Sequence, residues 1–144
     1  MKQQNGPWAG VGIMIVKDGK VLLGKRHGDS KKAKSALHGA GKWTMPGGKV
    51  HFKEKVDDAA FREVLEETSL KVNKEKLEII NVANDIAGGM HFVTVGFLCR
   101  DFEGEPKVME PDEITCWEWF CLKDLPKPLY FPSVKILRKY KEKF

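Results

Sequence analysis

The chain has 144 residues, of which 42% are hydrophobic and 31% are charged, and its formal net charge is +5. This length and apolar content predict one globular domain, residues 1–144, that is long enough to bury a substantial core. The sequence has no run of 18 or more apolar residues and no charged, apolar leader at Met1, so we expect a cytoplasmic protein without a membrane span or a secretory signal.

The first predicted elements form a hairpin. Residues 8–16 are apolar and rich in β-branched side chains, Asp18-Gly19 favours a tight turn, and residues 21–26 continue as a second strand. Residues 25–42 form a basic loop rich in Gly, Ser, Ala and Lys, and residues 42–48 indicate a short strand broken by Pro46. We expect the basic loop to face the acidic helix that follows it and to attract a phosphate-bearing ligand.

The central helix is predicted from Glu54 to about Thr68. Val56, Ala60 and Val64 recur at four-residue spacing, which is typical of one buried face. Three more strands are expected after this helix, then a proline-rich connector, and then an amphipathic helix that closes the chain with Ser133 as its N-cap. The strands and the connector are residues 77–86, 91–100, 114–122 and 126–132.

This order of elements predicts an α/β or α+β layered domain, with a mixed β-sheet partly covered by two helices. The three cysteines lack the paired short spacing of a zinc site, so we expect them to be reduced and mostly buried. We assign the tryptophans Trp43, Trp117 and Trp119 mainly to packing.

The central helix carries three carboxylates within about a third of its circumference, because Glu63, Glu66 and Glu67 are spaced i, i+3, i+4. An exposed acidic helix would account for them, although like charges at this spacing weaken a helix. If the three carboxylates are partly buried, their mutual repulsion raises the pKa of at least one of them unless a hard divalent cation is bound. Gly47 and Gly48, just upstream, could offer backbone carbonyls to a metal or amides to a phosphate.

Residues 48–70 resemble the signature of the Nudix hydrolases, which reads Gly, five residues, Glu, seven residues, Arg-Glu-apolar-any-Glu-Glu-any-Gly-apolar. Ser69 stands where the signature has Gly, at a position after the helix where a left-handed backbone is usual. A residue other than glycine in that conformation costs on the order of 1 kcal/mol of stability. The eight of nine defined positions that agree are Gly48, Glu54, Arg62, Glu63, Val64, Glu66, Glu67 and Leu70.

The resemblance extends from about Trp8 to Tyr140, through the stretches VLLGKR, WTMPGG, HFVTV, EPDEITCWEW and LPKPLYFP. These stretches look like the MutT-related nucleoside triphosphate diphosphatases of animals and plants. The loop from His27 to Lys42 is longer than is usual in that branch.

The resemblance implies a metal site for Mg²⁺ or Mn²⁺ on the central helix. Glu63 and Glu67 would be its main ligands, with Glu66 next and the Gly47 carbonyl as a further ligand, and one of the glutamates would activate the attacking water. Arg62 would orient the carboxylates through charge-assisted pairs, and Glu54 would fix the loop or the start of the helix.

Further residues match positions that contact substrate in similar proteins. Arg26 corresponds to a phosphate contact, although an exposed arginine at a strand end is the alternative. Glu110 corresponds to an extra metal ligand or base, and equally reads as an ordinary loop acid. Thr94 and Phe131 correspond to the base pocket, although an aromatic residue beside two prolines also suits simple packing.

The leading hypothesis is a Mg²⁺-dependent nucleoside triphosphate diphosphatase that releases pyrophosphate from ordinary or oxidised nucleoside triphosphates such as 8-oxo-dGTP. Within the enzyme class, the alternatives are dihydroneopterin triphosphate, NADH and other dinucleotides, sugar nucleotides and capped RNA. Outside it, the alternative is a nucleotide-binding domain without turnover. The expected partners are a small nucleotide and, from the resemblance, a second copy in a homodimer, but no sequence-specific nucleic acid.

Overall fold

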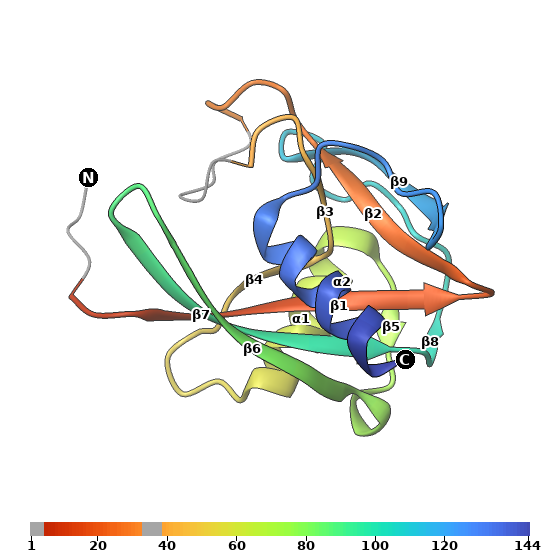
Figure 1. The fold of residues 1–144 in the computed structure, drawn as a ribbon, viewed down its shortest axis with the longest axis horizontal. Coiled ribbons are helices and arrows are strands. Elements are labelled where there is room, and N and C mark those ends of the chain that lie inside the picture. The colour runs from red at the N-terminus through yellow and green to blue at the C-terminus, as the bar shows by residue number, and fades with distance from the viewer. Residues whose placement is uncertain (1–4, 33–38) are drawn as a thin grey trace.

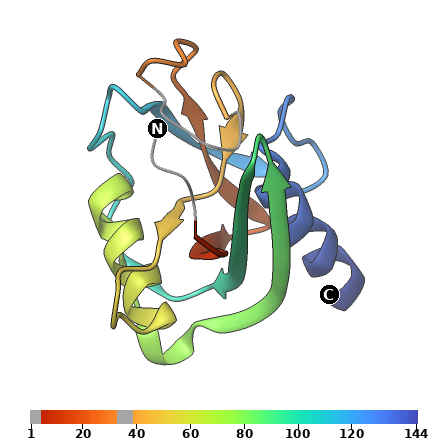
Figure 2. The same cartoon turned by 90° about the vertical axis from the view of Figure 1, so that its left-hand side faces the viewer.

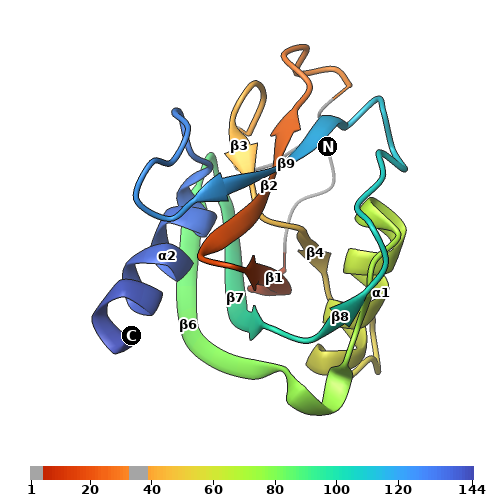
Figure 3. The same cartoon turned by 90° about the vertical axis from the view of Figure 1, so that its right-hand side faces the viewer.

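A computed structural model describes residues 5–32 and 39–144, which form a mixed sheet with one long helix on each side (Figure 1). The two helices lie on opposite sides of the sheet in Figures 2 and 3. The elements are β1 (Trp8–Lys17), β2 (Lys20–Arg26), β3 (Trp43–Thr44), β4 (Gly47–Lys49), α1 (Val56–Thr68), β5 (Lys71–Val72), the 3₁₀ turn η1 (Lys74–Lys76), β6 (Glu78–Ala87), β7 (Met90–Cys99), β8 (Phe102–Glu103), β9 (Ile114–Cys121) and α2 (Phe131–Lys143).

The predicted hairpin joins β1 to β2. Asp18 and Gly19 both have left-handed backbones, with φ of 52° and 73°, and Lys17 pairs with Lys20 across the turn. Two consecutive positive φ angles match the right-handed twist of the flanking strands, which is why Asp-Gly is favoured at such turns. The prediction of this hairpin is confirmed.

Strand β1 is the centre of the seven-stranded sheet, whose order is β3-β2-β1-β7-β6. It runs parallel to β7 and antiparallel to β2 and β4, and β9 adds to the other side of β2. The predicted mixed sheet is therefore confirmed, and β4 comes to lie beside β1 and next to α1.

Each face of the sheet has its own core. Ile13 and Ile15 of β1 pack with Ala60 of α1, whereas Met14 between them packs with Ile136 of α2. Alternate side chains of a strand point to opposite faces, so a central strand covered on both sides is apolar at nearly every position. This explains the continuous apolar run in β1.

The start of α2 differs from the prediction. The helix begins at Phe131 with Tyr130 as its N-cap residue, and Pro132 lies in its first turn. Proline suits that position because its missing N–H would have no partner there. Ser133 is buried inside the helix instead of capping it, and its Oγ accepts a hydrogen bond from the Met45 N–H at 3.0 Å.

The cysteines also differ in part from the prediction. All three are free thiols, but only Cys99 is buried, while Cys116 is half-buried and Cys121 is exposed at the end of β9. Neither helix in the described part of the chain is both long and apolar enough to cross a membrane.

Candidate active site

The three carboxylates of α1 differ sharply in exposure. The side chain of Glu66 is 52% exposed, that of Glu63 is 14% exposed, and Glu67 belongs to the buried face of the helix together with Ala60 and Val64. A solvated acidic helix therefore accounts for Glu66 alone. Glu63 is half-buried and Glu67 is buried, and removing a carboxylate from water costs free energy unless it is hydrogen-bonded or binds a cation.

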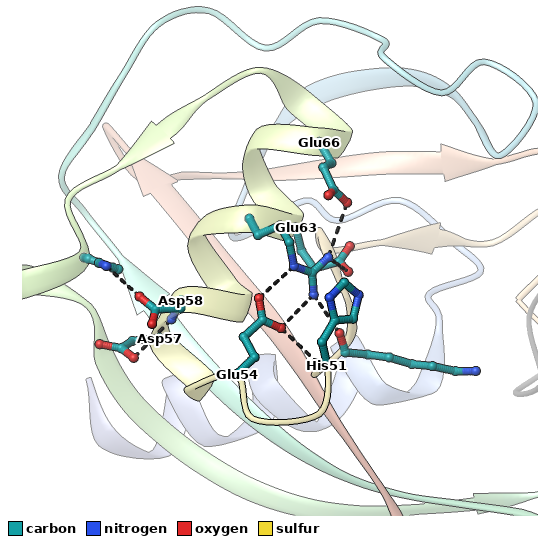
Figure 4. Close-up of polar contacts among 9 residues, drawn as sticks. His51, Glu54, Asp57, Asp58, Glu63 and Glu66 are labelled. Carbon is teal, nitrogen blue, oxygen red and sulfur yellow. Dashed lines mark hydrogen bonds and ion pairs between the residues drawn. The ribbon is translucent and has the colours of Figure 1, made fainter.

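Arg62 connects most of the acidic groups (Figure 4). Its guanidinium donates two hydrogen bonds to Glu54, at 2.8 and 3.0 Å, and one to Glu63 at 2.8 Å. A longer contact of 3.4 Å reaches Glu66, and a further bond of 2.9 Å reaches the backbone carbonyl of Lys49. Arg62 thus ties the loop after β4 to α1 and fixes the orientation of Glu63.

The glycines of β4 allow the backbone to pass directly against these carboxylates. The Gly47 N–H donates to Glu67 Oε2 at 2.8 Å, and a Cβ at Gly48 would lie 2.6 Å from the carboxyl carbon of Glu63. A side chain at position 48 would therefore displace Glu63. On the other side of α1, the indole N–H of Trp117 donates to the Glu67 carbonyl oxygen at 3.0 Å.

Burial dominates the electrostatics of the site. It raises the pKa of Glu63 to about 7, against the opposing effect of Arg62, and it raises the pKa of Glu67 well above the ordinary value, with a further contribution from the charge of Glu63. Burial also raises the pKa of Glu110, assisted by the nearby acids. The pKa of Glu54 moves the other way, to about 2, because Arg62 donates hydrogen bonds to its carboxylate.

A divalent cation suits this donor set, although the described residues contain no preformed group of three His, Cys, Asp or Glu side chains that would hold a metal. Arg62 holds Glu63 and Glu66 in ion pairs, and Glu67 accepts a hydrogen bond from the Gly47 N–H. Mg²⁺ usually takes only one or two carboxylates and completes its shell with waters and substrate phosphates. Glu67 offers a buried carboxylate whose charged form a bound cation would stabilise.

The carboxylates open into a cavity of about 480 Å³. Nine of the eleven predicted site residues line this cavity. Glu54 and Phe131 do not line it: Glu54 pairs with Arg62, and the Phe131 ring lies beside that of Tyr130. The predicted residues that line it are Arg26, Gly47, Gly48, Arg62, Glu63, Glu66, Glu67, Thr94 and Glu110.

Several lining residues were not foreseen from the sequence. Lys49 and His51 follow the glycines of β4, Phe92 precedes Thr94 by two positions on β7, and Tyr130 precedes Phe131. The sequence pattern gave little indication of these residues. Phe92 could be predicted only because it lies two positions before Thr94, which places both side chains on one face of β7.

The basic loop predicted over residues 25–42 is described only in part, because residues 33–38 lie outside the described ranges. Within the described portion, Arg26 reaches the cavity, whereas the Lys25 ammonium lies over the ring of Trp43 at 5.4 Å. The expectation that the whole loop faces the acids stays a prediction.

The model of the NUDIX domain matches residues 6–140. This chain belongs to the NUDIX domain family. The expected Nudix fold and the expected class, a Nudix hydrolase, are confirmed with it. A MutT NUDIX hydrolase from Burkholderia pseudomallei has a similar structure, with 36% sequence identity, a TM-score of 0.82, and coverage of 94% of this chain and 98% of that chain.

Relatives with named activities come from different lineages. An oxidized purine nucleoside triphosphate hydrolase of Danio rerio is 36% identical over 79% of this chain and 66% of its own length. An ADP-ribose pyrophosphatase of Methanocaldococcus jannaschii is 33% identical over 93% of this chain and 73% of its own length. The narrower resemblance to an animal and plant branch therefore stays a prediction.

Proposed function

We propose that this chain is a divalent-metal-dependent nucleoside triphosphate diphosphatase that cleaves ordinary or oxidised nucleoside triphosphates to a monophosphate and pyrophosphate. The observation that supports it best is the cavity, in which the half-buried carboxylate of Glu63 and the buried carboxylate of Glu67 share one space with the cationic side chain of Arg26. Carboxylates for a metal and a guanidinium for phosphate are the groups that phosphoryl chemistry needs.

In this proposal Glu63, Glu67 and Glu66 hold Mg²⁺ or Mn²⁺, together with the Gly47 carbonyl. The metal, when bound, neutralises phosphate oxygens and lowers the pKa of a coordinated water. Arg62 keeps Glu63 in its orientation through the 2.8 Å hydrogen bond. A glutamate of this group takes the proton of the attacking water.

The remaining predicted residues bind the substrate. Arg26 and the Gly48 backbone contact the phosphates, Thr94 contacts the base, and Glu110 is a further metal ligand or base in the same cavity. The proposed base contact of Phe131 is less well supported, because its ring packs beside Tyr130 and lies 5.3 Å from the Lys135 ammonium.

A second candidate is cleavage of ADP-ribose or of a dinucleotide such as NADH. The archaeal relative supports it, since that ADP-ribose pyrophosphatase is similar over 93% of this chain. Dihydroneopterin triphosphate is a further alternative. A binding domain without turnover is less well supported, because the chain keeps Glu54, Glu63, Glu66 and Glu67 of the signature.

Product analysis across a substrate panel tests the proposal. Purified protein with Mg²⁺ is given ordinary and oxidised nucleoside triphosphates, dihydroneopterin triphosphate, NADH and ADP-ribose, each with an EDTA control. We expect pyrophosphate release from nucleoside triphosphates that EDTA abolishes. AMP from NADH or ADP-ribose would support the second candidate instead, and binding without turnover would support a non-catalytic domain.

We further propose that residues 1–144 act as one domain in the cytoplasm and associate as a homodimer. Light scattering on the eluting chromatographic peak measures the mass directly. A mass of twice the 16.3 kDa chain is expected, and a mass of one chain at micromolar concentration would contradict the dimer.

A further inference from the structure

Arg26 occupies an unusual position at the end of β2. The pairing of β2 with β9 shifts register between Lys25 and Arg26, and the Arg26 backbone N–H turns instead to the Lys42 carbonyl at 2.9 Å. An irregularity of this kind redirects a side chain out of the regular alternation of the strand. It gives Arg26 a place in the cavity wall.

The Nε atom of Arg26 is buried and has no hydrogen-bond partner among the described residues. Leaving a buried charged donor unpaired costs more than leaving a neutral one. The guanidinium borders a cavity in which a substrate phosphate could pair with it.

Tyr130 supports this guanidinium from the N-terminal end of α2. The Arg26 Cζ lies 5.4 Å from the centre of the Tyr130 ring. The backbone that carries this ring is anchored, because the Tyr130 N–H donates to the Trp43 carbonyl at 2.8 Å and the Tyr130 carbonyl accepts from the Ser133 N–H at 3.0 Å. Stacking occupies the face of a guanidinium and leaves its N–H edge available to phosphate oxygens.

Gly39 covers the same pair from the loop. A Cβ at Gly39 would lie 2.5 Å from Arg26 Nε and 2.9 Å from Cε1 of Tyr130. Those distances are shorter than carbon contacts allow, so the backbone fits over the stack only because residue 39 has no side chain.

We infer that Tyr130 and Gly39 clamp the Arg26 guanidinium in the orientation that binds substrate phosphate, which makes both of them positioning residues. The inference rests on the proposed function, because it assumes a phosphate-bearing ligand in this cavity. Tyr130 acts through Arg26, so its effect requires that arginine.

A double-mutant cycle tests this dependence. Binding of a non-hydrolysable α,β-methylene nucleoside triphosphate is measured by calorimetry for wild type, Tyr130→Leu, Arg26→Ala and the double variant, and kcat and KM are measured on the same samples. We expect Tyr130→Leu to raise Kd and KM about tenfold with kcat nearly unchanged, whereas the same substitution in the Arg26→Ala background changes Kd by less than about twofold.

Two further comparisons distinguish a role in positioning Arg26 from a nonspecific disruption of the fold. Tyr130→Phe keeps the ring and is expected to restore most of the affinity. Gly39→Ala is expected to weaken binding, whereas Gly28→Ala in the same loop should not, because a Cβ at Gly28 has no neighbour within 4 Å in the part of the chain that the structure describes. Thermal unfolding of each variant shows whether it folds.

Additive effects of Tyr130→Leu and Arg26→Ala, or unchanged affinity in Tyr130→Leu, would overturn the inference while leaving turnover and the proposed function intact. Tight binding and a coupled cycle without any turnover would overturn the proposed function alone. A wild-type protein that binds no nucleotide would overturn both.

Discussion

Arg62 lines the cavity and organises the site by holding its carboxylates in place. Its Nε and Nη2 donate to the Glu54 carboxylate, and its Nη1 donates to Glu63. Its Nη2 also donates to the Lys49 carbonyl. A guanidinium can satisfy these directions together because its donors are fixed in one plane. The sequence predicted that Arg62 would orient the carboxylates, but the link to the loop after β4 depends on tertiary structure.

Arg62→Lys should be strongly disruptive even though it keeps the charge. A lysine ammonium cannot donate to Glu54 in two parallel bonds and also reach Glu63, so we expect a loss of about 1–3 kcal/mol of stability and a marked fall in turnover. Denaturant unfolding and steady-state kinetics measure the two effects. Arg138→Lys, on the exposed side of α2, is the matched control, and equal behaviour of the two variants would contradict the role of Arg62.

The cysteines provide a test that is independent of metal. Burial raises the pKa of the Cys99 thiol to about 11, so folding disfavours its thiolate and only about one molecule in a thousand is ionised at pH 8. Iodoacetamide at pH 8 should therefore label exposed Cys121 in the native protein, and Cys99 only after unfolding. Peptide mass spectrometry reads out both sites, and equally fast labelling of Cys99 would contradict its burial.

At the scale of elements, the end of α1 was predictable from the sequence, and the structure shows the strained, left-handed backbone of Ser69 at that end. Ser69 has φ of 67°, the left-handed conformation expected where the family signature has Gly, and its N–H donates to the Leu65 carbonyl. The side chain offsets part of the strain, because Ser69 Oγ donates to the Glu105 carbonyl at 3.2 Å.

Ser69→Gly should stabilise the protein. Removing the left-handed strain is worth about 1 kcal/mol and losing the exposed hydrogen bond subtracts part of it, so we expect a rise in Tm of roughly 1–3 °C. Ser69→Ala keeps the strain and loses the hydrogen bond, and should lower Tm. The opposite order of the two variants in a thermal scan would contradict this account of the helix end.

Other element boundaries could not be found from sequence alone. Ser133 looked like an N-cap because serine is common there, but Tyr130 begins the helix and the serine is buried against Met45. The two-residue strands β5 and β8 pair with each other over too short a length to leave an alternating pattern. Such features are decided by contacts between distant segments, which local propensity does not encode.

At the scale of the whole molecule, the fold brings segments that are far apart in sequence to one cavity. β4 lies against α1, Thr94 comes from β7, and Tyr130 comes from the start of α2. The acidic residues were predictable because their spacing is local to one helix. The arrangement around Arg26 was not, because Gly39 and Tyr130 are far apart in sequence and meet only in the folded chain.

We propose above all that the buried carboxylate of Glu67 holds a metal for hydrolysis. The most direct measurement compares turnover and nucleotide binding of Glu67→Gln with wild type, using Glu78→Gln, at an exposed position of β6, as the control. We expect turnover of Glu67→Gln to fall at least about tenfold with nucleotide binding largely kept, because a metal ligand is lost while the pocket stays. Equal turnover of Glu67→Gln and wild type would contradict the assignment of the metal site.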